Sequence, residues 1–170
     1  MGRASVKTDK NIYHLAREAL NLTRAAASEK MGFISESRIE KIEYEKTLPQ
    51  PEDVLAMSKA YKNPGLCNYY CSRECPIGQE YIPEVKEKSL SQIVLELLSS
   101  LNTLSKEKER LIDISVDGKI TDDELQDFAR IRSELTSISM TVDALQLWIN
   151  NTIASGNLDK EKLDSFTSAL

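Results

Sequence analysis

The sequence predicts an all-α protein that consists of an N-terminal bundle of five short helices followed by a long antiparallel, coiled-coil-like helical hairpin. Two observations favour this fold class. Apolar residues recur three and four positions apart in both halves of the chain, which is the period of an α-helix. Only five prolines and six glycines are present in 170 residues, too few for a β protein with many turns.

The first half contains the signals of short helices with tight breaks between them. Apolar spacing predicts the first helix over residues 12–20. Thr23 can cap a second helix, and Gly32 ends it. Ser35 or Ser37 caps a third helix. The buried side of this third helix would be formed by Ile39 and Ile42.

Prolines mark the next elements. Pro51 opens a fourth helix, because proline suits the first helical turn and the acids that follow suit the positive end of the helix dipole. A short fifth helix is predicted over the cysteine-containing stretch that ends before Pro76. The stretch 78–88 is predicted to be a linker.

The second half carries a heptad-like apolar stripe that predicts two long helices. The stripe consists of Leu90, Val94, Leu97, Leu101, Leu104 and Leu111, and then of Leu125, Phe128, Ile131, Leu135, Ile138, Val142, Leu145 and Ile149. Thr121 and Glu124 form a capping box before the second helix. The short connection makes the two helices antiparallel neighbours. A last short helix is predicted over residues 157–166.

One hairpin has only one seam, so half of its apolar surface needs another partner. The simplest partner is a second copy of the chain, which gives a four-helix bundle. Leu147 and Trp148, near the end of the hairpin, are expected to be core or dimer contacts.

The charge distribution limits the partners that each half can bind. Residues 1–66 hold 11 Lys and Arg against 9 Asp and Glu, whereas residues 67–170 hold 11 against 18. Only the N-terminal part can approach a polyanion without strong repulsion. The sequence lacks a membrane-spanning stretch and a signal peptide, so a cytoplasmic location without membrane partners is expected. It also lacks a glycine-rich phosphate loop and a nucleophile-elbow serine, so no enzymatic activity is expected.

Residues 15–61 contain an ordered set of segments, LTRAAASEKMG, SRIEKIE, EKTLP and PEDVLAMSKAY. Within this set, the pair Ile42-Glu43 is followed six residues later by Pro49. With these features the region resembles the Cro/repressor-type helix-turn-helix proteins, often called the Xre family. The Leu-rich hairpin is similar to partner domains of such regulators in bacteria.

This resemblance implies that the third helix lies in the major groove of double-stranded DNA. Base-edge contacts are implied for Ser35, Glu36, Ser37, Arg38 and Lys41. Arg38 would bind guanine, and Glu36 would accept from a cytosine amino group. Phosphate contacts are implied for Thr23, Arg24, Lys46 and Thr47. Two copies would read half-sites about one helical turn apart, ~34 Å.

Several positions depart from the family pattern. Arg24 stands where Gln is usual, and Glu45 stands where Gly is usual. One extra residue lies in the turn before the third helix. Glu36 and Glu40 stand where the family tends to have Ser, Thr, Gln or Arg, and a carboxylate near phosphates is repelled unless it finds a donor. An acid at Glu43 is usual and implies a structural role.

Three cysteines, Cys67, Cys71 and Cys75, are each four residues apart and form one stripe on a helix. Thiolates so placed can share a zinc ion, and His14, the single histidine, is a candidate fourth ligand. The same spacing also fits a buried helix face, because cysteine behaves as a small apolar residue. By itself, His14 is interpreted as a surface or interface residue.

The stretch DISVDGKITDDE fits a twelve-residue EF-hand loop, with candidate calcium ligands Asp113, Ser115, Asp117 and Glu124. A tight turn at Asp117-Gly118 followed by the capping box explains the same residues. EF-hand helices diverge, whereas the apolar stripes favour antiparallel packing. The hairpin turn is therefore the preferred interpretation.

These observations predict four segments: a DNA-binding domain over residues 1–66, a cysteine-containing connector over 67–88, a dimerisation hairpin over 89–153, and a short helix or tail over 154–170. The predicted function is sequence-specific regulation of transcription by a homodimeric repressor that needs no cofactor. Two alternatives stay open. One is a protein-interaction module with the acidic third helix facing a partner, and the other is a metal- or redox-gated regulator that acts through the cysteines.

Overall fold

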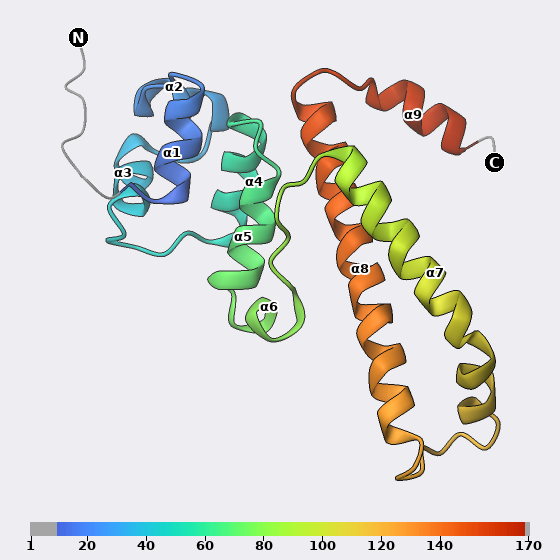
Figure 1. Cartoon of the computed structure of the whole chain (residues 1–170). Coiled ribbons are helices and arrows are strands. Elements are labelled where there is room, and N and C mark those ends of the chain that lie inside the picture. Colours follow the sequence, from blue (N-terminus) through green and yellow to red (C-terminus); the bar gives the residue numbers. More distant parts are fainter. Residues whose placement is uncertain (1–9, 169–170) are drawn as a thin grey trace. The chain divides into compact units, whose positions relative to one another are not determined.

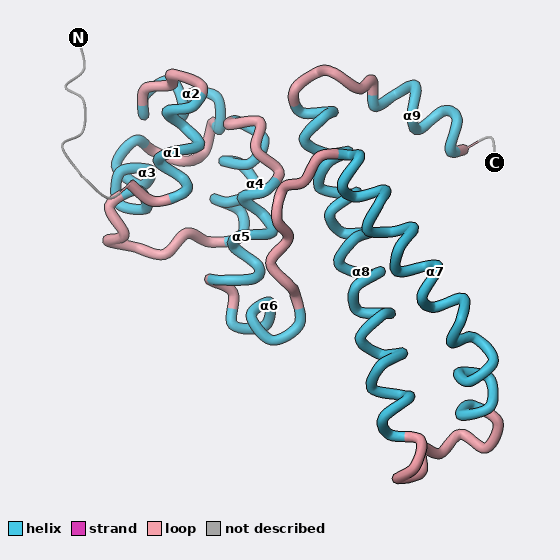
Figure 2. The backbone as a smooth tube through the Cα atoms, in the orientation of Figure 1, coloured by secondary structure: helices cyan, strands magenta, loops and turns pink. Residues whose placement is uncertain are grey.

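The computed structural model describes residues 10–168, and every regular element in this range is an α-helix (Figures 1 and 2). The all-α fold class is therefore confirmed. The chain divides into two compact units. One comprises the residues up to Glu84 together with those from Asn150 on, and the other comprises Val85–Ile149. No helix in the described range is both long and apolar enough to cross a membrane.

The first three helices begin at the caps that the sequence contains. Asn11, Thr23 and Ser35 each accept a hydrogen bond from the backbone N–H three residues later, which satisfies a donor that the helix leaves unpaired. Ser35, rather than Ser37, is thus the cap of the third helix. The helices are α1 (Ile12–Ala19), α2 (Arg24–Met31) and α3 (Glu36–Glu43). Gly32 ends α2 with a φ of 77°, a value that favours glycine.

Helix α4 (Pro51–Ala60) has proline in its first turn and a capping box formed by Gln50 and Asp53. The Asp53 carboxylate accepts from the Gln50 N–H at 2.8 Å. The core of this unit lies between α1, α2, α3, α4 and the start of the next helix, α5 (Gly65–Arg73). Its fully buried side chains include Tyr13, Ala27, Ile34, Ile39, Ile42, Met57 and Leu66.

The prediction of a linker over residues 78–88 is wrong for residues 78–81, which are helical. The cysteine-containing stretch before it packs on the core. Helix α5 (Gly65–Arg73) places Leu66 in the core, with Cys67, Tyr69 and Tyr70 packed against it. Pro76 does not only end α5. It also opens a further helix, α6 (Pro76–Tyr81), because proline suits a first helical turn. Gly78 is required there, since a Cβ at this position would lie 1.9 Å from the Cys71 carbonyl oxygen.

The second unit contains the two predicted long helices, α7 (Leu90–Ser115) and α8 (Leu125–Ala154), which run antiparallel (Figure 1). Ser89 and Gln92 form a capping box at the start of α7. Polar contacts join the two helices along their length. Ser100 and Ser137 are hydrogen-bonded at 3.1 Å, Arg110 donates to Asp127 at 2.7 Å, and Arg130 donates to Glu107 at 2.8 Å.

The predicted apolar stripe is divided between two surfaces of the hairpin. On α7 the buried positions are Ile93, Ser100 and Ile114, with Leu97, Leu104 and Leu111 partly buried; Ile93 and Ile114 were not in the predicted stripe. The predicted positions Leu90, Val94, Leu101, Leu125, Leu135 and Val142 are between 39% and 52% exposed. The apolar arc is wider than one seam, and spacing alone does not show which edge of the arc faces the neighbouring helix.

A last short helix, α9 (Lys160–Thr167), follows α8, and the Asp159 carboxylate accepts from the Lys162 N–H at its start. This agrees with the helix predicted over residues 157–166. The ends of the predicted segments at residues 1–9 and 169–170 lie outside the described residues.

Candidate nucleic-acid interface

Helix α3 presents one buried and one exposed face. Ile39, Ile42 and Glu43 are each no more than 1% exposed and fix α3 against the core. The opposite face carries the exposed residues Glu36, Ser37, Glu40 and Lys41. This outward face has two acids and one lysine, so its charge is mixed rather than basic. Direct contact to base edges would have to come from these four side chains and from Ser35, which is exposed at the start of α3.

Arg38, for which the family resemblance implies a contact to guanine, is held by a residue of the next helix. Its Nε donates to both carboxylate oxygens of Asp53 at 3.0 Å, and its Nη2 donates to Asp53 Oδ2. Burial acts to raise the pKa of Asp53, but the hydrogen bonds from Arg38 and from the Gln50 N–H outweigh it and lower that pKa. Binding of guanine by Arg38 would require this bidentate pair to open, so Arg38 fits a role in positioning α3 against α4 better.

Glu43 is the centre of a buried ionic network. Its carboxylate is 0% exposed and accepts from Arg17 Nη2 at 3.0 Å and from Arg24 Nε at 2.8 Å. His14, which is also 0% exposed, places its Nδ1 3.9 Å from Glu43 and its Nε2 3.0 Å from Glu18. The geometry agrees with the structural role implied for Glu43. The interpretation of His14 as a surface or interface residue is wrong, because its side chain is buried within the domain.

Tyr44 brings two cations together next to this network. The Arg24 guanidinium lies 5.1 Å from the centre of the Tyr44 ring, and the Lys46 ammonium lies 5.7 Å from the same centre. Thr23 is exposed at the N-terminus of α2, and Thr47 is exposed next to Lys46. The four residues for which the resemblance implies phosphate contacts therefore come from two segments, the start of α2 and the loop after α3. The cation of each segment, Arg24 or Lys46, lies next to Tyr44.

The backbone of the loop between α3 and α4 explains why the family usually has glycine at the position of Glu45. Glu45 has a φ of 57°, in the left-handed region that disfavours residues with a Cβ. The Lys46 and Thr47 N–H groups then both donate to the Lys41 carbonyl, at 2.8 Å and 3.4 Å. This turn fixes where Lys46 projects.

The turn before α3, which contains one extra residue, is packed into the core through Ile34. Ile34 is 2% exposed, and its carbonyl accepts from the Ser28 hydroxyl at 2.7 Å. Ser35 then begins α3 as its cap. The longer turn is therefore anchored at Ile34.

The two metal interpretations lack the geometry that they need. Across residues 10–168, no group of three or more His, Cys, Asp or Glu side chains is placed to hold a metal ion. Cys67, Cys71 and Cys75 are half-buried free thiols, and burial together with the neighbouring thiols raises the pKa of Cys71, which disfavours the thiolate that metals bind. His14 is committed to Glu18 and the Glu43 network.

The EF-hand interpretation is also not supported, because Asp113 and Ser115 belong to the last turn of α7 rather than to a loop. Asp117 instead accepts from the Lys119 N–H in a tight turn around Gly118. Glu124 accepts from the N–H and hydroxyl of Thr121 at 3.0 Å and 2.8 Å. The hairpin turn and the glutamate half of the capping box account for these residues.

A comparison with known protein families supplies the deciding observation for α1 to α4. Residues 14–64 match a family model described as Helix-turn-helix. Residues 14–64 are a helix-turn-helix domain. Domains of this family occur in DNA-binding transcription regulators, so the resemblance to Cro/repressor-type proteins is confirmed for this range. No curated protein and no solved structure gives a significant match to the chain.

Three residues of the helix-turn-helix domain were not singled out from the sequence. Tyr44 gathers the cations, Asp53 holds Arg38, and Arg17 neutralises Glu43. For Asp53 the signal was present, because an acid in the first turn of α4 was recognised as favourable. Its second role, across to α3, depends on how the two helices pack and is not contained in the local sequence.

Proposed function

We propose that this protein is a sequence-specific DNA-binding repressor that acts as a homodimer. The observation that carries the proposal is the matched helix-turn-helix domain, with α3 fixed by its buried face and its opposite face exposed. In this arrangement α3 enters the major groove and its outward residues face base edges. Glu36 and Glu40 accept from cytosine amino groups, and Lys41 donates to guanine.

The cations on Tyr44 would bind the DNA backbone beside α3. Arg24 and Lys46 both lie over the ring of Tyr44, so both cations are close to this one side chain. The Arg24 and Ala25 N–H groups at the start of α2 have no hydrogen-bond partner within the described part of the chain, and free helix N-termini bind phosphate. Arg24 also donates to Glu43, so the phosphate site is tied to the core.

The hairpin provides the surface that binds the second copy of the chain. On α7, Leu90, Val94 and Leu101 form a stripe at spacings of four and seven residues, and on α8, Leu135 and Val142 are seven residues apart. Both stripes lie next to the hairpin seam and are displaced from it in the same rotational sense, which in antiparallel helices places them on the same side. We call these five residues the apolar side. Burying each would stabilise a dimer by about 1–2 kcal/mol.

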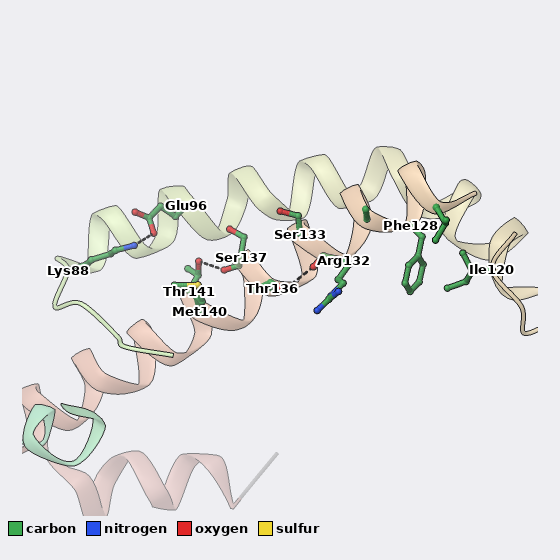
Figure 3. A pocket seen from close by; sticks show the side chains of 12 residues that line it. Lys88, Glu96, Ile120, Phe128, Arg132, Ser133, Thr136, Ser137, Met140 and Thr141 are labelled. Atoms are coloured by element: carbon green, nitrogen blue, oxygen red, sulfur yellow. Dashed lines mark hydrogen bonds and ion pairs between the residues drawn. The ribbon is translucent and has the colours of Figure 1, made fainter. Parts of the chain in front are cut away.

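The other side of the hairpin is a more polar groove of about 810 Å³ (Figure 3). Phe128 and Ile120 lie at one end of it, and the Lys88–Glu96 ion pair lies at the other. Between them stand Arg132 and a series of hydroxyl groups from Ser133, Thr136, Ser137 and Thr141. The groove therefore mixes apolar side chains with hydroxyl and charged groups, whereas all five residues of the apolar side are leucine or valine. For this reason we place the dimer contact on the apolar side.

A random-duplex selection with the purified chain tests the DNA-binding proposal. We expect recovery of a two-fold-symmetric motif with half-sites ~34 Å apart. Lys41→Ala should relax one base position of the motif. Lys106→Ala, which removes an exposed cation from α7, is the matched control and should leave the motif unchanged. A selection without enrichment at low salt would refute DNA reading and favour a protein-interaction role for the acidic face of α3.

Repression itself is tested by transcription in vitro. The selected motif is placed over a promoter or at a distant position on the same template. We expect the protein to lower transcription only from the first template, because a bound dimer covers DNA that the polymerase needs. Increased transcription from either template would argue for activation instead.

A further inference from the structure

A second surface of the helix-turn-helix domain is not used by the proposed DNA contact. It is a groove of about 600 Å³ between the end of α2, the turn that follows, and the outer side of α4. None of the residues proposed to contact bases or phosphates lines it. The groove therefore calls for an explanation of its own.

The groove exists because α4 carries small residues where it faces outward. Ala56 and Ala60 are one turn apart and leave a hollow beside the buried Met31. Two large apolar side chains stand exposed at its sides, with Phe33 at 68% and Leu55 at 50%. Exposed apolar residues around a hollow mark a site of interaction more often than isolated ones do.

The rim of the groove is basic. Lys30, Lys59 and Lys62 are exposed, and none of them forms an ion pair with any part of the chain that the structure describes. The single acid of the rim is Glu52, at the opposite end of α4 from Lys59 and Lys62. Three uncompensated cations around an apolar floor favour an occupant that combines apolar and acidic groups.

We propose that this groove binds an acidic amphipathic helix of a partner protein. Glu52 and Lys59 are seven residues apart on α4, which corresponds to ~10 Å and to about two turns of a docked helix. The docked helix would place apolar side chains at positions i, i+4 and i+7 against Phe33, Leu55 and the alanines. Its carboxylates would pair with the lysines at the rim.

Nucleic acid fits this surface less well. Phosphates would pair with the three lysines, but they would leave Phe33 and Leu55 exposed to water. An amphipathic helix satisfies both parts of the groove. Binding of such a helix does not depend on the DNA contact of α3, so the two functions can be tested separately.

The test is a selection of displayed random peptides of about twelve residues, sufficient for three helical turns, on the full chain without DNA. We expect the recovered peptides to be acidic and to carry apolar residues at helical spacing. Synthetic versions are then titrated by fluorescence anisotropy against the chain and against Phe33→Ser and Lys59→Glu. Each variant should weaken binding about tenfold or more, because Phe33→Ser removes a large apolar contact and Lys59→Glu replaces an attractive charge with a repulsive one.

Lys106→Glu, which makes the same charge change on α7, is the matched control and should leave peptide affinity unchanged. Both groove variants alter exposed side chains, and their circular dichroism should equal that of the unchanged chain. Recovery of no peptides, of basic peptides, or of peptides that bind the variants equally well would overturn the proposal. A loss of duplex affinity in Lys59→Glu, without peptide binding by the unchanged chain, would instead assign the lysines to DNA. Peptide binding without any DNA enrichment would support this site while refuting the DNA-binding proposal.

Discussion

At the scale of single residues, Glu43 shows how one carboxylate on the proposed reading helix serves the core. It is fully buried, and the charges of Arg17 and Arg24 compensate it. A buried charge without a partner is strongly unfavourable, so the three side chains depend on each other. Because Arg24 also borders the proposed phosphate site, the network connects folding of the domain to its DNA-facing surface.

We expect Glu43→Gln to lower the free energy of unfolding by about 3–5 kcal/mol, because two guanidinium groups lose their buried counter-charge. Urea denaturation followed by circular dichroism measures this change. Glu40→Gln, on the exposed face of the same helix, is the control and should stay within about 0.5 kcal/mol of the unchanged chain. Equal effects of the two substitutions would show that the network does not stabilise the domain.

Glu45 occupies the left-handed region of φ that glycine adopts without strain. We expect Glu45→Gly to raise the free energy of unfolding by about 1 kcal/mol, since the Cβ strain is removed. Glu45→Ala separates the two effects of the change, because it removes the carboxylate and keeps the Cβ. If thermal unfolding shows the alanine variant to be as stable as the glycine variant, loss of charge rather than relief of strain is the cause.

The Arg38–Asp53 pair predicts a pH dependence of stability. The pKa of Asp53 is lowered in the folded state, so its contribution is present above the ordinary aspartate pKa, about 3.9, and is lost as the pH falls through the folded value. Asp53→Asn should therefore lower the free energy of unfolding by about 1 kcal/mol at pH 7, and the difference should shrink below about pH 4. Urea unfolding of both chains between pH 2.5 and 7 checks this, and a difference that is constant with pH would contradict it.

At the scale of elements, the hairpin has two unlike sides. The apolar side exposes two leucines and a valine on α7 and one leucine and one valine on α8, whereas the groove side combines apolar residues with hydroxyl and charged groups. The polar contacts between Ser100 and Ser137 and between Arg110 and Asp127 hold α7 and α8 in register without using the apolar side. This leaves the apolar side free for a second copy.

We expect Leu101→Glu to convert a dimer into a monomer, because a carboxylate would be buried in the apolar contact at a cost of several kcal/mol. Size-exclusion chromatography with light scattering measures the mass. Ser133→Glu places the same charge on the groove side and should remain dimeric. A monomer from Ser133→Glu together with a dimer from Leu101→Glu would place the interface in the groove.

At the scale of the whole molecule, the proposal joins two units with different tasks. The helix-turn-helix domain would read one half-site, and the hairpin would make two domains bind as one. Linking two binding events in this way raises affinity without any new contact to DNA. The dimer contact and the DNA contact should therefore be separable by mutation.

We expect Leu101→Glu to weaken binding to a full two-half-site duplex by about 10²-fold while leaving affinity for a single half-site unchanged. Fluorescence anisotropy with both duplexes checks this. Insertion of five base pairs between the half-sites rotates them to opposite faces of the duplex and should have a similar effect on the unchanged chain. Equal losses on the single half-site would mean that the hairpin acts on the fold of the DNA-binding domain rather than through avidity.

The sequence by itself determined the helical class, the cap at Thr23, the break at Gly32, and the order of helices in the helix-turn-helix domain. These are local properties, because each depends on residues within one turn of the chain. For the third helix the sequence left the cap open between Ser35 and Ser37. It also indicated the two long helices, since their apolar period is sustained over many residues.

Only the tertiary structure decided which side chains meet. Arg38, for which a DNA contact was predicted, pairs with Asp53 in this structure. His14 was interpreted as a surface or interface residue and is buried beside Glu43. The same holds for the hairpin, where Ile93 and not Leu90 faces the seam. Long side chains and wide apolar arcs can reach several partners, and the packing of helices distant in sequence selects one of them.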